Sequence, residues 1–178
     1  SSIYKMIQDC EEWKHISRDM KEQKPRNLEL SVKRFLIGYP CTWTLAFSNV
    51  LVVRNQISSL ISKVQEGGIV ALLGAGAEGK STLIKQLSVQ LCQEGYFILF
   101  HNQRKSYKLP KALPDNTVLV VDDPDESSFV QLLKQVYENG ITLLFAARYN
   151  EWNFFCERYN ITSDVIRSIT IIEMEKIT

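Results

Sequence analysis

The sequence predicts an α/β fold, in which a mainly parallel, five-stranded sheet lies between two layers of helices. Two patterns predict it. Short apolar runs alternate with segments of helical periodicity from residue 69 onward. A glycine-rich loop joins the first of these runs to the helix that follows. With 178 residues, 45% of them apolar and 23% charged, the chain is long enough for one such domain and short for two.

The first 25 residues predict a separate N-terminal linker helix. Apolar side chains recur at every third or fourth position of residues 3–22, as in an amphipathic helix. Pro25 ends the pattern, because proline lacks the backbone N–H that a helix needs. The helix could cover the core or connect it to another domain. Residues 26–178 are assigned to one domain, which we expect to be a fragment of a longer protein, since it lacks an initiator Met and stops after a strand-like run.

Before the regular pattern begins, the chain has an irregular stretch and one helix. Residues 26–50 show no single period, and 35–40 resemble an extended piece that enters a turn. A helix is predicted over 54–64, ended by the glycine pair 67–68. The apolar face of this helix is formed by Ile57, Leu60, Ile61 and Val64.

Strands and helices then alternate to the end of the chain. Strands are predicted over 69–73, 96–100, 118–121, 141–147 and 169–172. Helices are predicted over 80–94, 127–138 and 151–159. The inward face of the first of these helices is formed by Leu83, Ile84, Leu87 and Leu91. Continuous apolar runs are typical of parallel strands that are buried on both faces, so we expect helices on both sides of the sheet.

Residues 74–81 carry the pattern G-x-x-x-x-G-K-S in full, the Walker A pattern of a phosphate-binding loop. The loop consists of Gly74, Ala75, Gly76, Ala77, Glu78, Gly79, Lys80 and Ser81, and Thr82 follows it. Glycines let backbone N–H groups turn toward a phosphate, and the following helix adds the positive end of its dipole. Lys80 would contact the β- and γ-phosphates, and Ser81 would supply a hydroxyl ligand to Mg²⁺. The expected ligands are ATP or ADP. No N/T-K-x-D pattern for reading guanine is present, and a guanine nucleotide stays an alternative.

Two neighbouring acids close the third predicted strand, as in a Walker B motif. Asp122 lies where a parallel strand reaches the ligand edge of a sheet, and could hold Mg²⁺ through water. Asp123 would then orient or deprotonate the attacking water. A plain strand followed by a polar turn would give the same pattern.

Three further residues are candidates at the nucleotide. Arg148 ends the fourth predicted strand, where a planar cation could distinguish ATP from ADP. Val53 and Arg54 precede the helix that leads into the first predicted strand and could face adenine, although the residues alone favour an ordinary helix start. Each of these contacts is a hypothesis.

Charge, cysteines and hydropathy exclude several classes. A net charge of +1 gives no field that would draw the whole chain to nucleic acid or an anionic membrane. A basic loop contains Arg104, Lys105 and Tyr107 and could contact nucleic acid. Because the rest of the chain is not basic, we interpret it as a solvated surface loop. No apolar run is long enough to span a membrane, and the four scattered cysteines suit reduced thiols in the cytoplasm.

Together these residues resemble the STAND class of signal-transduction P-loop ATPases, of ASCE/AAA+-like fold, which includes apoptosome and plant resistance-protein ATPases. The likeness rests on four features: residues 52–54, the loop 74–81, the paired acids 122–123, and Ala147-Arg148. Residues 35–43, which include Trp43 as a further candidate nucleotide contact, and residues 147–152 resemble bacterial STAND proteins of antiviral defence.

The resemblance implies a nucleotide switch. In such proteins ADP maintains a closed state, ATP permits self-association, and slow Mg²⁺-dependent hydrolysis resets the switch. It also implies an upstream effector domain and a downstream sensor domain, neither of which is present in this chain. An AAA+ motor or loader, a small-molecule kinase and a non-hydrolysing nucleotide-binding module remain alternatives.

Overall fold

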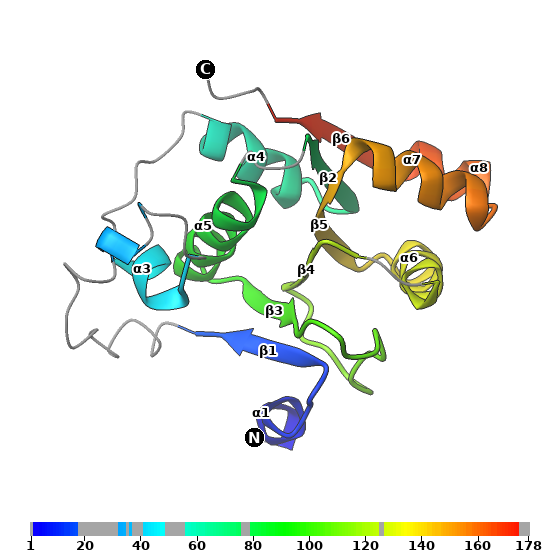
Figure 1. Ribbon diagram of the computed structural model, residues 1–178. Helices are drawn as coiled ribbons and strands as arrows, with labels where there is room; N and C mark the ends of the chain where they lie inside the picture. Colours follow the sequence, from blue (N-terminus) through cyan, green and yellow to red (C-terminus); the bar gives the residue numbers. More distant parts are fainter. Residues whose placement is uncertain are drawn as a thin grey trace.

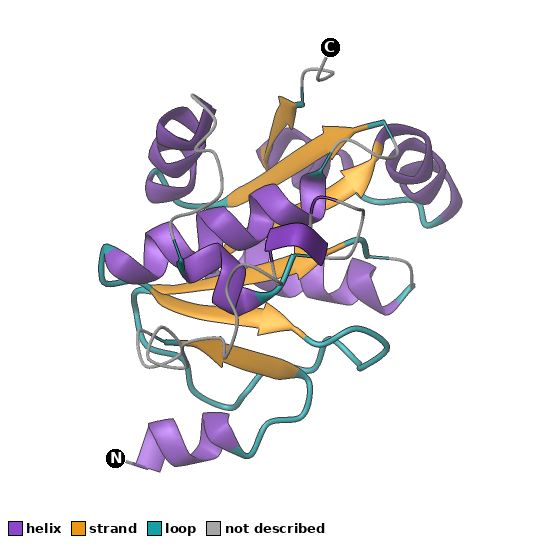
Figure 2. Cartoon of the chain, turned by 60° about the vertical axis from the view of Figure 1, so that its left-hand side comes forward, coloured by secondary structure: helices purple, strands orange, loops and turns teal. Residues whose placement is uncertain are grey.

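The protein is described by a computed structural model over residues 2–17, 32–34, 36, 41–48, 56–75, 79–124 and 127–174. A six-stranded sheet of order β1-β3-β4-β5-β2-β6 lies between two layers of helices (Figure 1, Figure 2). The strands are β1 (Trp13–Ile16), β2 (Ile69–Gly74), β3 (Phe97–His101), β4 (Thr117–Asp122), β5 (Thr142–Arg148) and β6 (Ile169–Glu173). The helices are α1 (Ser2–Gln8), α3 (Trp43–Phe47), α4 (Gln56–Gln65), α5 (Lys80–Gln93), α6 (Ser128–Asn139), α7 (Tyr149–Arg158) and α8 (Ser163–Ser168).

The α/β fold class predicted from the sequence is confirmed. The five strands from β2 to β6 correspond to the five predicted strands, and every neighbouring pair among them is parallel. β2 and β4 read as continuous apolar runs because helices cover the sheet on both faces. The sixth strand, β1, adds to the outer edge of β3 in the antiparallel direction.

Helices α3, α4 and α5 pack on one face of the sheet, and α6, α7 and α8 pack on the other (Figure 1). The predicted apolar faces of α4 and α5 are both buried. Those residues are Ile57, Leu60, Ile61 and Val64 of α4 and Leu83, Ile84, Leu87 and Leu91 of α5. Burying one such side chain contributes about 1.5–3 kcal/mol relative to leaving it exposed, so α5 is fixed firmly against the strands that carry the candidate site.

The helix predicted over 3–22 is wrong over residues 9–17. α1 ends at Gln8, and β1 follows from Trp13 to Ile16. Trp13 and Ile16 are both buried and lie three positions apart, a spacing that suits either one helix face or the two ends of a short strand. Pairing with β3 decides the outcome, since it covers backbone groups that an open sheet edge would leave exposed.

Two short helices are absent from the predictions. α3 has five residues and α8 has six, too few to show a helical period in the sequence. Thr42 caps α3, and its hydroxyl accepts a hydrogen bond of 3.2 Å from the backbone N–H of Leu45. The extended piece predicted over 35–40 lies almost entirely outside the described residues. In the described part of the chain, no helix is both long and apolar enough to cross a bilayer.

Candidate nucleotide site

The sheet brings the main candidate residues to one edge. β2, β4 and β5 are parallel, so their carboxyl ends meet at that edge. Gly74 ends β2 and is the ladder partner of Arg148, which ends β5. Asp122 ends β4 and is the ladder partner of Ala146. The start of the glycine-rich loop, the first acid and the arginine are therefore neighbours, although they are far apart in the sequence.

The glycine-rich loop joins β2 to α5, and its last glycine, Gly79, has a backbone conformation that favours glycine. Gly79 precedes α5 with φ 75°, in the left-handed region that costs a residue with a Cβ about 1–2 kcal/mol. Gly76, Ala77 and Glu78 lie outside the described residues. Thr82 is half-buried on the first turn of α5. The loop thus ends at a helix N-terminus, where backbone N–H groups lack helical partners and can bind an anion.

Lys80 is the first residue of α5 and is buried. It is 8% exposed, and its Nζ donates a hydrogen bond of 3.1 Å to the backbone carbonyl of Ala75. The hydrogen bond to Ala75 already restricts the ammonium group, so a phosphate bound by the loop would meet a cation that has lost much of its conformational freedom.

Ser81 and Asp122 are in contact across the site. The Ser81 hydroxyl donates a hydrogen bond to the Asp122 carboxylate, which connects the start of α5 to the end of β4. Burial raises the pKa of Asp122 above its ordinary value, and the neighbouring Asp123 charge adds to the rise. The Ser81 hydrogen bond and the positive charges of Lys85 and Lys80 act in the opposite direction.

This donor set fits Mg²⁺ chemically. A hydroxyl and a carboxylate are oxygen ligands, and Mg²⁺ commonly uses one or two such protein ligands and completes its shell with water and substrate phosphates. No cluster of three or more His, Cys, Asp or Glu side chains suited to a dedicated metal site occurs in the described residues. Ser81 and Asp122 could therefore hold the ion of a Mg²⁺–nucleotide complex.

Asp123 is exposed, and its backbone is in an unusual conformation. Its φ of 56° lies in the left-handed region, and its N–H donates a hydrogen bond of 2.8 Å to the carbonyl of Ala146. Asp and Asn tolerate this region better than most other residues. The chain therefore turns sharply between the two acids, and the second carboxylate reaches solvent at the edge of the site, where it could accept a proton from water.

Arg148 is exposed at the end of β5. Its Nη1 lies 3.8 Å from Oε1 of Glu151 on the first turn of α7. Both side chains are more than half exposed, so this ion pair is worth about 1 kcal/mol or less. The guanidinium group could exchange this partner for a phosphate at little cost.

Of the predicted adenine contacts, Trp43 alone lies among the described residues. Val53 and Arg54 lie outside the described residues. Trp43 is half-buried, and its ring packs edge-on against Phe100 of β3 at a centroid distance of 4.8 Å. β4 and β5 separate β3 from β2. Trp43 thus contributes to packing beside α5, and its contact with a nucleotide stays a prediction.

Lys85 was absent from the sequence-based candidates. Its Nζ donates a hydrogen bond of 2.5 Å to the carbonyl of Cys41 and lies 5.6 Å from the centroid of the Trp43 ring. The spacing from Ser81 held the signal, because residues four apart lie on the same side of a helix. Lys85 thereby connects the segment 41–43 to the helix of the phosphate site.

Two pockets lie at opposite edges of the sheet. One of about 160 Å³ adjoins the acid pair and is otherwise lined by His101, Gln103, Arg104, Lys105 and Tyr107. A larger one of about 400 Å³ lies near Thr117 and Thr142, at the amino ends of β4 and β5. Despite its size, the second pocket lies across the sheet from the glycine-rich loop, so the smaller one is the one related to the candidate chemistry.

Solved structures support the fold. The chain is similar to Hsp104 in a closed state with ATPγS and casein, with a TM-score of 0.55, 15% identity, and coverage of 72% of this chain and 28% of that one. It is also similar to the ADP complex of S. cerevisiae Hsp104, with a TM-score of 0.53, 15% identity, and coverage of 72% and 23%. The chain thus spans about a quarter of the length of these Hsp104 chains. At this identity the likeness shows a shared fold and nothing about function.

The family assignment comes from the sequence. A comparison with curated proteins gives no match. A comparison with protein-family models matches residues 33–160, most of the chain, to the family described as "Novel STAND NTPase 5". The matched region contains the glycine-rich loop, the acid pair and Arg148. With the STAND resemblance confirmed by this match, the chain is a nucleotide-binding NTPase module and belongs to the novel STAND NTPase 5 family.

Proposed function

We propose that this chain is the ATP-operated switch domain of a cytoplasmic STAND signalling protein, with antiviral defence as the expected setting. ADP maintains the closed state of the parent protein, exchange for ATP permits self-association, and slow hydrolysis resets the switch. The observation that carries the proposal is the pairing of Gly74 with Arg148 at the sheet edge that also holds Asp122. This arrangement lets one site sense whether a γ-phosphate is present.

Each role follows from position and chemistry. Lys80 and the N–H groups at the start of α5 hold the phosphates, and Arg148 contacts the γ-phosphate. Asp123 accepts a proton from the water that attacks the γ-phosphorus, while the bond to the β–γ bridging oxygen breaks and ADP leaves. Ser81 and Asp122 would hold Mg²⁺, which when bound neutralises charge on the phosphates.

A switch needs a difference in affinity between states, because a ligand shifts an equilibrium only by its differential binding. The Arg148 side chain supplies a source of that difference. When no γ-phosphate is present, Arg148 has a weak partner in Glu151. When one is present, Arg148 can bind the oxygens of this doubly charged group. A planar guanidinium can bind two phosphate oxygens at once. That interaction is stronger than the solvent-exposed ion pair between Arg148 and a carboxylate.

An AAA+ motor or loader is the second candidate, and the fold shared with the Hsp104 chains favours it. Motors of that type usually carry Glu after the Mg²⁺-binding Asp, and Asn or Thr at the end of the neighbouring strand. This chain has Asp123 and Arg148 at those places. The switch therefore remains the preferred function, and a non-hydrolysing binding module is the third.

The nucleotide that stays bound through purification separates the first two. Protein purified without added nucleotide would be denatured and its supernatant analysed by chromatography, and turnover with saturating Mg–ATP would be measured in parallel. A switch is expected to retain close to stoichiometric ADP and to turn over far more slowly than the roughly 1 per second of ordinary enzymes. A nucleotide-free protein with fast turnover and an ATP-dependent ring in sedimentation would support the motor instead.

A further inference from the structure

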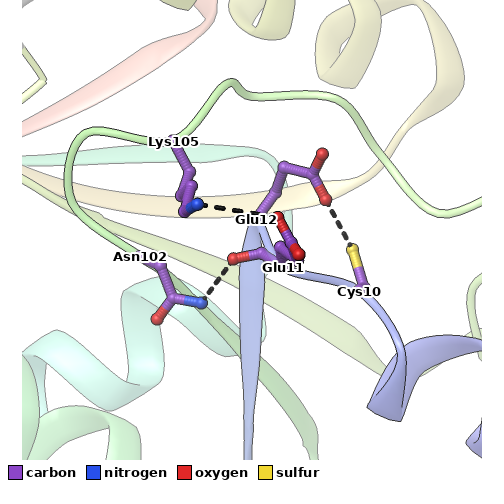
Figure 3. Close-up of polar contacts among 5 residues, drawn as sticks. All are labelled: Cys10, Glu11, Glu12, Asn102 and Lys105. Carbon is purple, nitrogen blue, oxygen red and sulfur yellow. Dashed lines mark hydrogen bonds and ion pairs between the residues drawn. The ribbon is translucent and has the colours of Figure 1, made fainter.

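The loop that follows β3 is fastened to the N-terminal segment of the chain. Asn102, the first residue after β3, makes two hydrogen bonds to that segment. Its backbone N–H donates to the carbonyl of Glu12 at 2.9 Å. Its Nδ2 donates to the carbonyl of Glu11 at 2.8 Å (Figure 3). Residues some 90 positions apart in the sequence are thus joined where β1 begins.

Trp13 holds both ends of the same loop. Its ring is 1% exposed, and its indole Nε1 donates a hydrogen bond of 2.9 Å to the carbonyl of Lys108. The ring also meets His101 edge-on at a centroid distance of 5.2 Å. His101 precedes the loop and Lys108 follows its tightest part, so one buried side chain fixes the distance between them.

His101 organises the interior of the loop. Its Nε2 lies 3.0 Å from the carbonyl oxygens of both Lys105 and Ser106. Carbonyl oxygens only accept hydrogen bonds, so Nε2 carries the proton. The imidazole also stacks on Tyr107 at 4.2 Å, which buries a tyrosine that would otherwise be free to stack on a base. These contacts of His101 therefore give the loop a defined conformation.

This loop forms the outer wall of the pocket beside the acid pair. Gln103 and Arg104 line that pocket together with Asp122 and Asp123. Arg104 has φ 67°, a left-handed conformation that costs an arginine about 1–2 kcal/mol and persists only where the surroundings impose it. Arg104 lies in the turn closed by the hydrogen bond of 3.2 Å from the N–H of Lys105 to the carbonyl of Asn102, and Asn102 is itself held by the N-terminal segment.

The exposed contacts of the cluster contribute little. The ion pair between Lys105 and Glu11 spans 3.5 Å, with side chains 50% and 81% exposed. Such pairs are typically worth about 1 kcal/mol or less. The Cys10 thiol donates a weak hydrogen bond of 3.1 Å to Glu12 on the same segment. The positioning effect is therefore assigned to Trp13 and Asn102.

We propose that residues 10–16 are a positioning element of the nucleotide site. Trp13 and Asn102 hold the loop 102–108 so that Arg104 and Gln103 enclose the side of the acid pair where the attacking water would lie. This inference rests on the proposed nucleotide-binding function and goes beyond it, because it makes the N-terminal segment part of the hydrolytic site. A nucleotide with a γ-phosphate would lie against this loop, so its binding is expected to change the surroundings of the Trp13 indole.

Two variants test the proposal, with a control on the same strand. Trp13→Phe removes the indole N–H and keeps an aromatic ring, and Asn102→Ala removes one hydrogen bond to the segment. Lys14→Gln is the control, since Lys14 is exposed on β1 and does not line the acid-pair pocket. Single-turnover hydrolysis of Mg–ATP would be compared with calorimetric affinity for Mg–ATPγS.

We expect both variants to lower the hydrolysis rate constant by about tenfold or more, as misplacement of a group near the reacting atoms does. Their affinity for Mg–ATPγS should change by no more than about twofold, because the phosphate loop is untouched. Lys14→Gln should match wild type in both. A loss of affinity equal to the loss of rate would indicate a general structural role and overturn the proposal.

The contact of nucleotide with the loop has its own readout in the indole N–H resonances of ¹⁵N-labelled protein, because the Trp13 indole N–H donates to Lys108 of that loop. The Trp13 signal is identified by its loss in Trp13→Phe and is expected to move with Mg–ATPγS more than with Mg–ADP. If wild type binds nucleotide but this signal stays fixed, the positioning role is refuted while the nucleotide site stands. If wild type binds no nucleotide, the proposed function itself fails.

Discussion

Gly74 and Arg148 are ladder partners at the ends of β2 and β5, so the first residue of the glycine-rich loop lies directly beside the arginine. It follows from parallel register alone, because both strands end at the same level. The backbone register alone thus places Arg148 beside the loop, as the proposed contact with a γ-phosphate requires.

Arg148→Ala is expected to weaken binding of Mg–ATPγS by about tenfold or more, the value of a charge-assisted hydrogen bond. Affinity for Mg–ADP should be nearly unchanged, since ADP offers no γ-phosphate. Calorimetry with both nucleotides measures the difference. Glu151→Gln is the matched control, because it removes the exposed partner of Arg148 and leaves the guanidinium group available. Equal losses for the two nucleotides would contradict a γ-phosphate contact.

Asp123→Asn is expected to retain nucleotide affinity and to slow hydrolysis by about 10²- to 10⁴-fold, the usual contribution of a general base. Asn suits the φ of 56° at this position, so the turn after β4 should persist. Single-turnover assays give the rate. Asp115→Asn, an identical change in the loop before β4 at the opposite edge, should leave it unaltered. Normal hydrolysis by Asp123→Asn would mean that another residue activates the water.

Asp122→Asn is expected to stabilise the nucleotide-free protein at neutral pH. Burial raises the pKa of Asp122, and the charge of Asp123 raises it further. The folded protein therefore binds this proton more tightly than the unfolded chain, and the free energy of unfolding falls as pH rises from the ordinary Asp pKa of about 4 through the folded pKa.

Thermal unfolding in EDTA, over a series of pH values, checks this. The Tm of Asp122→Asn should exceed that of wild type at neutral pH, and the gap should close as the pH falls toward the ordinary Asp pKa. The same variant should lose the Mg²⁺ dependence of nucleotide binding, because an amide replaces an ionic ligand. A variant less stable than wild type at neutral pH would show that the carboxylate stabilises the fold.

The isolated chain is expected to bind nucleotide as a monomer and to hydrolyse ATP slowly. Asp123 and Arg148 are both exposed, and an attacking water held in line usually needs shielding by a neighbouring domain or subunit. Sedimentation with and without Mg–ATP, combined with a phosphate-release assay, tests this. A stable ATP-dependent ring with turnover at ordinary enzyme rates would contradict it.

The parallel core could be predicted from the sequence because its elements are long and their periods are distinct. β2 is an unbroken apolar run, and α5 repeats Leu83, Leu87 and Leu91 at helical spacing. The glycine-rich loop between them fixes the connection. Each of these signals is local and needs no knowledge of the rest of the chain.

The features that could not be predicted from the sequence depend on contacts between residues that are far apart along the chain. Trp13 and Ile16 fit a helix until β3 presents an open edge. The burial of Lys80 and the contact of Lys85 with Cys41 depend on side-chain placement that periodicity does not encode. The pocket beside the acid pair is built by His101 and Arg104, whose roles arise only when the loop after β3 folds back.

The central claim is that the loop 74–81 binds nucleotide phosphates, and calorimetric titration of wild type and Lys80→Met with Mg–ATPγS tests it most directly. Met keeps an aliphatic stem of similar length and removes the buried ammonium group, so the fold and its Tm should persist. Affinity is expected to fall by about 10- to 150-fold, the cost of losing a hydrogen bond to a charged group. Unchanged affinity in a folded Lys80→Met variant would contradict the assignment.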